Sequence, residues 1–271
     1  MKAAPFSYRR ARSAAEAVAM LGESPMAKAC GGSQSLGPML NLRLACVDSL
    51  VDLSAIDGLT GFSEGPQVLR IGAAVTHARI EDGALPDGTR GLLPRVAAGI
   101  AYRAVRNRGT IGGSLAHADP AADWVNTMCL LDATLVVLGP RGERAIRAAE
   151  FFLGAFTTAL EPDEVIVAVE VPRFSSRARW AYRKNCRKPG EFADAIGAAW
   201  VDPARGISRA LIGALGGMPH VIDGEDAVAA LRRPGGLARA VDAAGIEDDY
   251  EREVHATMLR RALDELDHFP T

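Results

Sequence analysis

The spacing of hydrophobic and polar residues predicts several short strands in the first two thirds of the chain. Residues 50–56, 68–75, 133–139 and 165–171 are rich in β-branched residues and partly alternate between apolar and polar. This pattern is typical of strands with one buried face. The third segment is followed by Pro-Arg-Gly, whose turn chemistry predicts a hairpin with a partner strand around residues 145–146.

Helical patterns separate these strands. A Ser-x-x-Glu capping box at Ser13 predicts a helix over residues 14–21. A second helix should begin at residues 76–78, and apolar positions in residues 91–102 recur at helical intervals. The dipeptide Asp119-Pro120 should begin another helix, because Asp is a favoured N-cap residue and Pro a favoured first helical residue.

The last third of the chain has a different pattern. A polar segment at residues 174–179 is the expected domain boundary. Beyond it, three strands of an antiparallel sheet are predicted at residues 180–185, 195–201 and 207–215. Three helical stretches follow at residues 227–231, 237–243 and about 249–266.

The composition excludes several classes of function. With 271 residues and 48% hydrophobic content, the chain can bury a substantial core in one large or two modest domains. Its net charge of −2 leaves no electrostatic footprint for nucleic acid. No apolar run approaches the roughly 20 residues that cross a bilayer, so no membrane span is expected.

The four cysteines are scattered along the chain. Cys30, Cys46, Cys129 and Cys186 form no C-x-x-C pair and no even framework, and the histidines show no metal-binding spacing. This pattern argues against a zinc site, an iron–sulfur cluster in this chain or a disulfide scaffold. We therefore expect no metal ligands here, and free thiols indicate a reducing compartment such as the cytoplasm.

Two glycine-rich segments carry the candidate chemistry. In one, Gly109, Gly112 and Gly113 surround Thr110 just before the expected helix. Glycine permits positive φ angles and leaves N–H groups open to an anion, and a glycine turn leading into a helix suits a phosphate-bearing cofactor. The segment matches neither the Walker pattern nor G-x-G-x-x-G, so a plain tight turn is the alternative.

The other glycine-rich segment lies near the N-terminus. Gly31-Gly32-Ser33 is followed by Gln34 and Ser35, whose side chains can donate hydrogen bonds. Two such segments can close on one dinucleotide.

Together with FFLGAFTTAL at residues 151–160 and PDEVIVAVEVP at residues 162–172, these segments resemble the FAD-binding medium subunit of the molybdenum hydroxylases. That family includes aerobic carbon monoxide dehydrogenase, xanthine dehydrogenase and N-heterocycle hydroxylases. The resemblance runs from residue 4 to about residue 266, and the motif RNRGTIGGSLAHADPAAD at residues 106–123 is its most specific part.

The resemblance implies an α+β fold with two domains. Residues 1–175 would form a FAD-binding PCMH-type domain of the vanillyl-alcohol-oxidase-like kind, with two α/β subdomains split near residue 58. Residues 176–271 would form a small domain like the C-terminal domain of carbon monoxide dehydrogenase flavoproteins, with a three-stranded antiparallel sheet and a helical bundle.

The resemblance also implies which residues bind the cofactor. The backbone of the N-terminal glycine-rich segment, residues 29–35, would hold the FAD diphosphate; it is called the first glycine-rich segment below, and the segment around Thr110 the second. Asp123 would accept hydrogen bonds from the ribose hydroxyls. The family pattern in the first segment is Ala-Gly-Gly-Gln/His-Ser, so Ser33 must take a backbone angle often given to Gly. The complete implied set is Ala29, Cys30, Gly31, Gly32, Ser33, Gln34, Ser35, Thr110, Gly112, Gly113, Ser114, His117, Asp123, Ile166, Tyr182 and Lys184.

Some of these positions have roles implied at the flavin ring. Tyr182 matches the tyrosine against the isoalloxazine ring in the carbon monoxide dehydrogenase type of subunit, where stacking would gate access to the flavin. Lys184 and Arg187 would place positive charge near its N1–C2=O edge. The alternatives are that Ile166 is a core residue, that Asp123 only complements a helix dipole, and that the basic residues form a solvated loop.

By this resemblance the chain is an electron-transfer subunit in which FAD carries the redox chemistry and no side chain is catalytic. A large subunit would hold molybdopterin-bound molybdenum and a small subunit two 2Fe–2S clusters, in a dimer of heterotrimers. The acceptor would be a quinone, oxygen or NAD. Two other functions stay open: a self-contained FAD-dependent oxidoreductase, and a flavin-free scaffold or maturation protein that keeps the fold.

Overall fold

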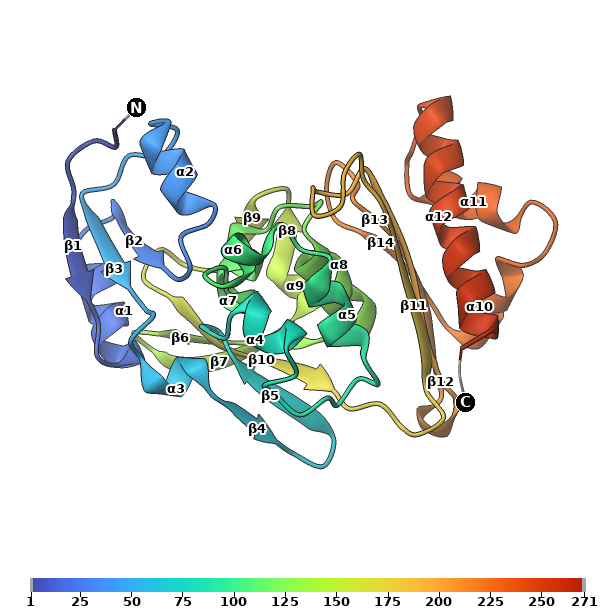
Figure 1. Ribbon diagram of the computed structural model, residues 1–271, viewed down its shortest axis with the longest axis horizontal. Helices are drawn as coiled ribbons and strands as arrows, with labels where there is room; N and C mark the ends of the chain where they lie inside the picture. The colour runs from blue at the N-terminus through green and yellow to red at the C-terminus, as the bar shows by residue number, and fades with distance from the viewer. Residues whose placement is uncertain (1, 270–271) are drawn as a thin grey trace.

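Three sheets follow one another along the chain in the computed structural model, which describes residues 2–269 (Figure 1). The N-terminal sheet lies at one end of the molecule, a five-stranded sheet with its helices occupies the middle, and the C-terminal sheet with three helices lies at the other end. The mixture of helices with parallel and antiparallel strands confirms the predicted α+β class.

The N-terminal sheet is parallel, with strand order β1-β3-β2. Helix α1 (Ala14–Gly22) begins as predicted, since the Ser13 hydroxyl accepts a hydrogen bond from the Glu16 N–H at 3.1 Å. Apolar residues of α1 share a core with Val167 in the middle sheet, which joins the two sheets. The other elements are β1 (Ser7–Arg10), β2 (Ala27–Cys30), α2 (Leu36–Asn41), β3 (Ser49–Asp52) and α3 (Asp57–Thr60).

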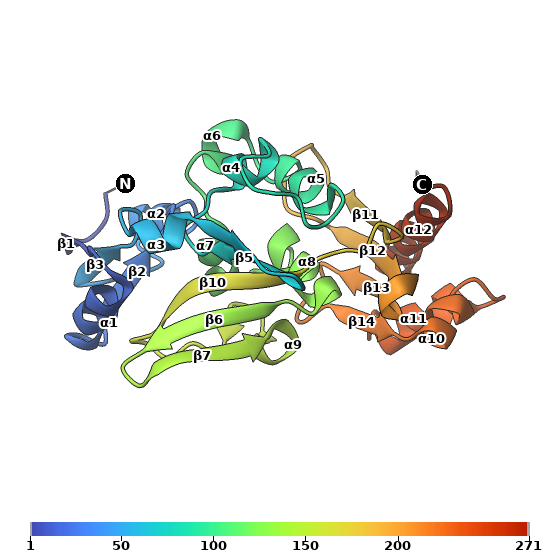
Figure 2. The ribbon, with the colours of Figure 1, turned by 90° about the horizontal axis from the view of Figure 1, so that it is seen from below.

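The middle sheet is antiparallel, with strand order β4-β5-β10-β6-β7. Helices α4, α5 and α6 lie over one side of it (Figure 2). The predicted hairpin is confirmed, and Gly142 provides the positive φ of its turn. The strands are β4 (Phe62–Glu64), β5 (Val68–Gly72), β6 (Thr134–Gly139), β7 (Gly142–Arg147), β10 (Val165–Pro172) and a separate pair, β8 (Phe152–Gly154) and β9 (Thr157–Thr158).

The helices of this region include three that were not predicted, at residues 103–106, 111–117 and 148–151, and the helix predicted over residues 91–102 spans only Leu92–Ala98. They are α4 (His77–Glu81), α5 (Leu92–Ala98), α6 (Arg103–Arg106), α7 (Ile111–His117), α8 (Asp123–Leu131) and α9 (Ala148–Phe151). A helix was expected from Asp119-Pro120, but α8 begins only at Asp123. The reason is that Asp119 forms a local turn, in which its carboxylate accepts from the Ala121 N–H at 2.9 Å.

The C-terminal sheet is antiparallel and has four strands rather than the three predicted. They are β11 (Arg179–Asn185), β12 (Ala195–Asp202), β13 (Ile207–Gly213) and β14 (His220–Asp223), with a 3₁₀ turn at Pro203–Arg205. Strand β14 was missed because it has only four residues and pairs with β13 alone, at the edge of the sheet. Alternation along β12 is regular: Ala198 and Trp200 pack toward the middle region, whereas Ala199 packs toward the terminal helices.

Those terminal helices cover the outer face of the C-terminal sheet (Figure 1). They are α10 (Glu225–Ala230), α11 (Gly236–Ala243) and α12 (Asp249–Asp267), close to the three predicted helical stretches. No helix within residues 2–269 is long and apolar enough to cross a membrane.

Candidate functional site

A cavity of about 900 Å³ lies between the N-terminal sheet and the middle region. Its walls come from the segment after β2, from the segment around α7 and from residues 156–164, and Phe192 of the C-terminal region also lines it. A cavity of this size is in the upper range for small-molecule and cofactor sites.

The first glycine-rich segment forms one wall of the cavity. All seven predicted residues from Ala29 to Ser35 line it, and Ser33 has φ +60°, the left-handed angle that was expected there. The Gln34 amide donates to the Gly32 carbonyl at 3.0 Å, so this side chain holds its own turn. Among residues 2–269, none accepts a hydrogen bond from the five backbone N–H groups of residues 31–35.

Whether residues 31–35 fit a FAD diphosphate depends on these five N–H groups. A run of unpartnered backbone N–H groups in a left-handed turn is a typical anion-binding concavity. A diphosphate would satisfy donors that the protein itself leaves unpaired. The donor set therefore fits the phosphate-bearing part of the cofactor.

The two glycine-rich segments touch each other through atoms that only glycine leaves exposed. A Cβ built on Gly32 would lie 1.8 Å from the carbonyl oxygen of Arg108 and 2.7 Å from the Cα of Gly109. A Cβ on Gly31 would lie 2.8 Å from the Thr110 hydroxyl oxygen. The two walls of the cavity thus meet along their backbones, and the glycines allow this approach.

The second glycine-rich segment was expected to be an open turn. In the structure it instead forms the first turn of α7. The Ile111 and Gly112 N–H groups donate to the carbonyls of Val75 and Ala73, at 3.0 and 2.9 Å, and the Gly113 N–H donates to the Thr110 hydroxyl at 3.1 Å. The N–H groups expected to be open to an anion are therefore already paired with the protein.

Four of the five predicted residues of this segment still line the cavity, namely Thr110, Gly113, Ser114 and His117. Gly112 does not line it. A Cβ at Gly112 would lie 2.5 Å from that of Ala73, so glycine is needed here for packing. The hydroxyls of Thr110 and Ser114 and the imidazole of His117 are the side-chain groups through which these residues could contact a ligand.

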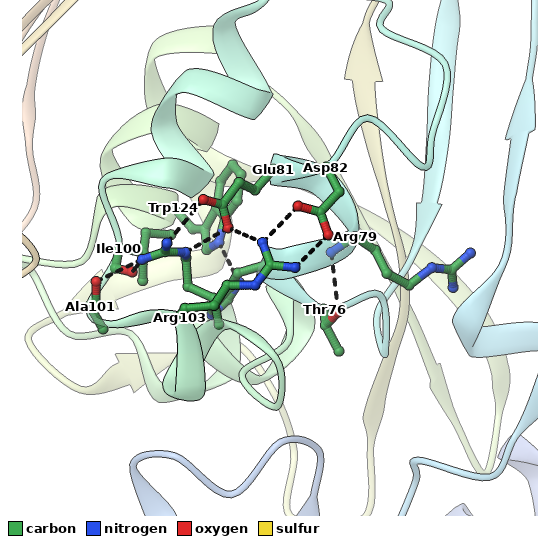
Figure 3. Close-up of polar contacts among 10 residues, drawn as sticks. Thr76, Arg79, Glu81, Asp82, Ile100, Ala101, Arg103 and Trp124 are labelled. Atoms are coloured by element: carbon green, nitrogen blue, oxygen red, sulfur yellow. Dashed lines mark hydrogen bonds and ion pairs between the residues drawn. The ribbon is translucent and has the colours of Figure 1, made fainter.

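An ion-pair network supports the wall next to this segment (Figure 3). Arg106 donates to the Glu81 carboxylate at 2.7 and 2.9 Å and to the carbonyls of Ile100 and Ala101 at 2.9 and 2.8 Å. Arg103 joins the same carboxylate at 2.8 Å. Since Ile100 and Ala101 line the cavity, the network fixes part of its wall to α4.

Asp123 lies at the cavity wall within a buried polar cluster. Its two oxygens accept from the Tyr182 hydroxyl and the Lys184 ammonium, each at 2.9 Å, and Lys184 also donates to the Gly99 carbonyl at 3.1 Å. Burial raises the pKa of Asp123, while Lys184 and Tyr182 oppose that shift. Burial, together with Asp123, raises the pKa of Tyr182 well above its usual value. The cluster ties α8 to β11.

Besides Gly112, three further predicted residues do not line the cavity, namely Ile166, Tyr182 and Lys184. Ile166 is a core residue of β10, which was the alternative for it. Tyr182 has its ring in the same core and its hydroxyl on Asp123, so the geometry does not support a flavin gate at this position. Arg187 is exposed and pairs with Glu191 four residues later.

Some side chains that the sequence did not single out also line the cavity. Phe156 and Phe192 do so with 60% of each residue exposed, and the Phe156 ring lies 5.2 Å from that of His117. The buried imidazole of His77 is a third. The only sequence signal for Phe192 is an apolar residue isolated in a polar loop.

Comparison with known protein families agrees with this geometry. The sequence profile described as "FAD binding domain in molybdopterin dehydrogenase" matches residues 4–174. The chain is 39% identical over 191 residues to the carbon monoxide dehydrogenase medium chain of Hydrogenophaga pseudoflava, covering 70% of this chain and 67% of that one. It is 33% identical to the nicotine 6-hydroxylase medium subunit of Paenarthrobacter nicotinovorans, covering 95% and 92%.

Solved structures extend the similarity over the whole fold. A chain of quinoline 2-oxidoreductase from Pseudomonas putida 86 superposes with a TM-score of 0.89 at 32% identity, covering 99% of both chains. A chain of carbon monoxide dehydrogenase from Hydrogenophaga pseudoflava superposes with a TM-score of 0.88 at 34% identity, again covering 99% of both. The chain therefore belongs to the family of FAD-binding domains of molybdopterin dehydrogenases, and it is an oxidoreductase subunit of the medium, FAD-binding type.

Proposed function

We propose that this chain is the electron-transfer subunit of a heterotrimeric molybdenum hydroxylase. The observation that carries the proposal is the row of five unpartnered N–H groups at residues 31–35, which faces a cavity large enough for a dinucleotide. When bound, FAD supplies a centre that exchanges electrons singly or in pairs. We further propose that residues 1–175 form the FAD-binding domain and residues 176–271 a separate C-terminal domain.

In this proposal the chain binds and orients FAD and shields it from water. The N–H groups of residues 31–35 hold the diphosphate, and the Thr110 and Ser114 hydroxyls supply further polar contacts. Asp123 accepts from the ribose hydroxyls, because a carboxylate has about four acceptor sites and only two are occupied by Tyr182 and Lys184.

We assign the aromatic contact with the flavin ring to Phe192 rather than Tyr182. Replacing Phe192 by Ala should weaken FAD binding by about 2- to 10-fold, the loss of a stacking contact worth about 0.5–1.5 kcal/mol, and should speed reoxidation of the reduced flavin by dioxygen. Titration of the apoprotein with FAD measures the first effect, and stopped-flow absorbance the second.

Leu153→Ala is the matched control for Phe192. Leu153 is also apolar and 62% exposed, but it does not line the cavity. Equal FAD affinities and reoxidation rates for the Phe192 and Leu153 variants would show that Phe192 does not contact the flavin.

The partners follow from the same proposal. The relatives are named as the medium chain of carbon monoxide dehydrogenase and the medium subunit of nicotine 6-hydroxylase. A medium subunit implies that the enzyme also has other subunits. We propose a large subunit with molybdopterin-bound molybdenum and a small subunit with two 2Fe–2S clusters. An external quinone, oxygen or NAD would be the acceptor, and the assembly would be a dimer of heterotrimers.

Isolation of the native complex through this chain tests the proposal. Equimolar FAD and molybdenum, with iron in excess over both, is the expected composition. A flavoprotein without molybdenum would instead indicate a self-contained FAD-dependent oxidoreductase. A complex without flavin would favour a scaffold that has kept the fold.

A further inference from the structure

His77 places a buried imidazole at the cavity, next to the second glycine-rich segment. It is the first residue of α4, its backbone N–H donates to the Gly109 carbonyl at 2.9 Å, and it is only 5% exposed. The residue lines the same cavity as the two glycine-rich segments. None of the FAD contacts proposed above involves this imidazole.

The tautomer of His77 follows from its contact with Trp124. The indole N–H of Trp124 donates to Nδ1 of His77 at 2.9 Å. An indole nitrogen can only donate, so Nδ1 must carry a lone pair, and the proton of a neutral ring must be on Nε2. Burial, reinforced by Arg106, lowers the pKa of His77 to about 4, so the ring is neutral at neutral pH.

The Nε2–H group of His77 has no acceptor in the described part of the chain. It makes no hydrogen bond within residues 2–269, and the Nε2 atom is accessible to solvent. It is therefore a donor open to the cavity.

Gly109 makes room for this ring. A Cβ on Gly109 would lie 2.8 Å from both Cδ2 and Nε2 of His77. An unpaired donor in a mostly buried position is unfavourable, which favours a ligand acceptor at Nε2 when the cavity is filled.

We propose that His77 is a cofactor-positioning residue, held by Trp124 as the Nε2–H tautomer so that it donates a hydrogen bond to an acceptor atom of bound FAD. The inference rests on the proposed FAD-binding function and adds to it a side-chain donor from α4. Trp124 holds the His77 ring at the start of α4, and Glu81 of the same helix belongs to the ion-pair network with Arg106, so one helix carries both the ring and part of the cavity wall's support (Figure 3).

Two variants of His77 separate the two ring nitrogens. In His77→Asn the side-chain carbonyl can replace Nδ1 as the acceptor for Trp124, but no donor reaches the place of Nε2. In His77→Gln the amide nitrogen can reach that place. Titration of each full-length apoprotein with FAD should show affinity about 10-fold weaker for the Asn variant and within about threefold of the parent for the Gln variant.

Nuclear magnetic resonance of ¹⁵N-histidine-labelled parent protein gives a second readout. The expected result is a neutral, Nε2-protonated His77 without FAD, with a shift of its Nε2–H signal on FAD addition. This measurement decides the question even if the Asn variant fails to fold.

Two results would overturn the inference alone: a folded Asn variant that binds FAD as tightly as the parent, or a ring protonated on Nδ1. A parent chain that binds no FAD, even with its partner subunits, would overturn the FAD-binding function and this inference with it.

Discussion

Replacing Gly32 by Ala should weaken FAD binding on the order of 100-fold. The added Cβ would lie 1.8 Å from the carbonyl oxygen of Arg108 and 2.4 Å from its carbon. Both are backbone atoms that cannot rotate away, so the two glycine-rich segments must separate. Losing two charge-assisted hydrogen bonds to the diphosphate would weaken binding on the order of 100-fold, and the overpacking itself would cost about 1–3 kcal/mol of stability.

Gly22→Ala is the matched control for this prediction. Gly22 lies in the last turn of α1, and a Cβ there would meet no atom within 4 Å. Alanine favours a helix over glycine by up to about 1 kcal/mol, so this variant should be as stable as the parent or more so, with unchanged FAD affinity. Both quantities can be measured by chemical denaturation and by FAD titration. Parent-like affinity in the Gly32 variant would show that closure of the two segments does not form the site.

Replacing Lys184 by Met should lower the free energy of unfolding by about 3–5 kcal/mol at neutral pH, because it leaves the Asp123 carboxylate buried without its ion-pair partner. Lys184 contributes both a charge and a hydrogen bond to this carboxylate, and its side chain is only 11% exposed. The Lys184→Met, Asp123→Asn double variant should recover much of the loss, since it leaves no buried charge.

The loss should depend on pH. Burial already raises the folded-state pKa of Asp123, and removal of Lys184 should raise it further. A carboxyl group whose pKa is raised by folding is tolerated when protonated and penalised when ionised. The stability difference between variant and parent should therefore be largest above the raised pKa and shrink as the pH falls toward the ordinary value of 3.8.

Arg187→Met is the matched control, three residues after Lys184. The Arg187 side chain is 78% exposed, and within residues 2–269 its one ion-pair partner is Glu191, so its loss should cost no more than about 0.5 kcal/mol, with little pH dependence. Urea denaturation between pH 5 and pH 8 would measure all three variants. A Lys184 variant that behaves like the Arg187 variant would contradict a structural role for the Asp123–Lys184 pair.

Much of the fold could be predicted from the sequence because its elements have regular patterns. Strands β6 and β10 of the middle sheet are short runs rich in β-branched residues and are buried along most of their length, and the Ser13 capping box marks a helix start by local chemistry alone. Strand β14 has no comparable pattern, since it is four residues long and gains its structure from pairing with β13.

The site could be predicted only where local sequence determines it. The first glycine-rich segment has its open N–H groups because of its own turn, including the positive φ of Ser33. In the second segment the Gly112 and Ile111 N–H groups pair with Ala73 and Val75, which are 39 and 36 residues earlier in the chain. No local pattern reveals such partners.

The proposed aromatic contact with the flavin shows the same limit. Tyr182 and Phe192 lie ten residues apart, and the resemblance favoured the tyrosine. In strand β11 the Tyr182 side chain points into the core, and its hydroxyl donates a hydrogen bond to Asp123. Phe192 lies beyond the end of that strand and lines the cavity. Which of the two aromatic residues reaches the cavity depends on the path of the chain between them, and neither residue's local sequence reveals that path.

The flavin content of the purified chain tests the central claim most directly. Acid release followed by chromatography identifies the flavin, and the visible spectrum gives its amount. Near-stoichiometric FAD, either in the isolated chain or after addition of FAD and the partner subunits, is the predicted result. A folded chain that takes up no FAD under either condition would contradict the account.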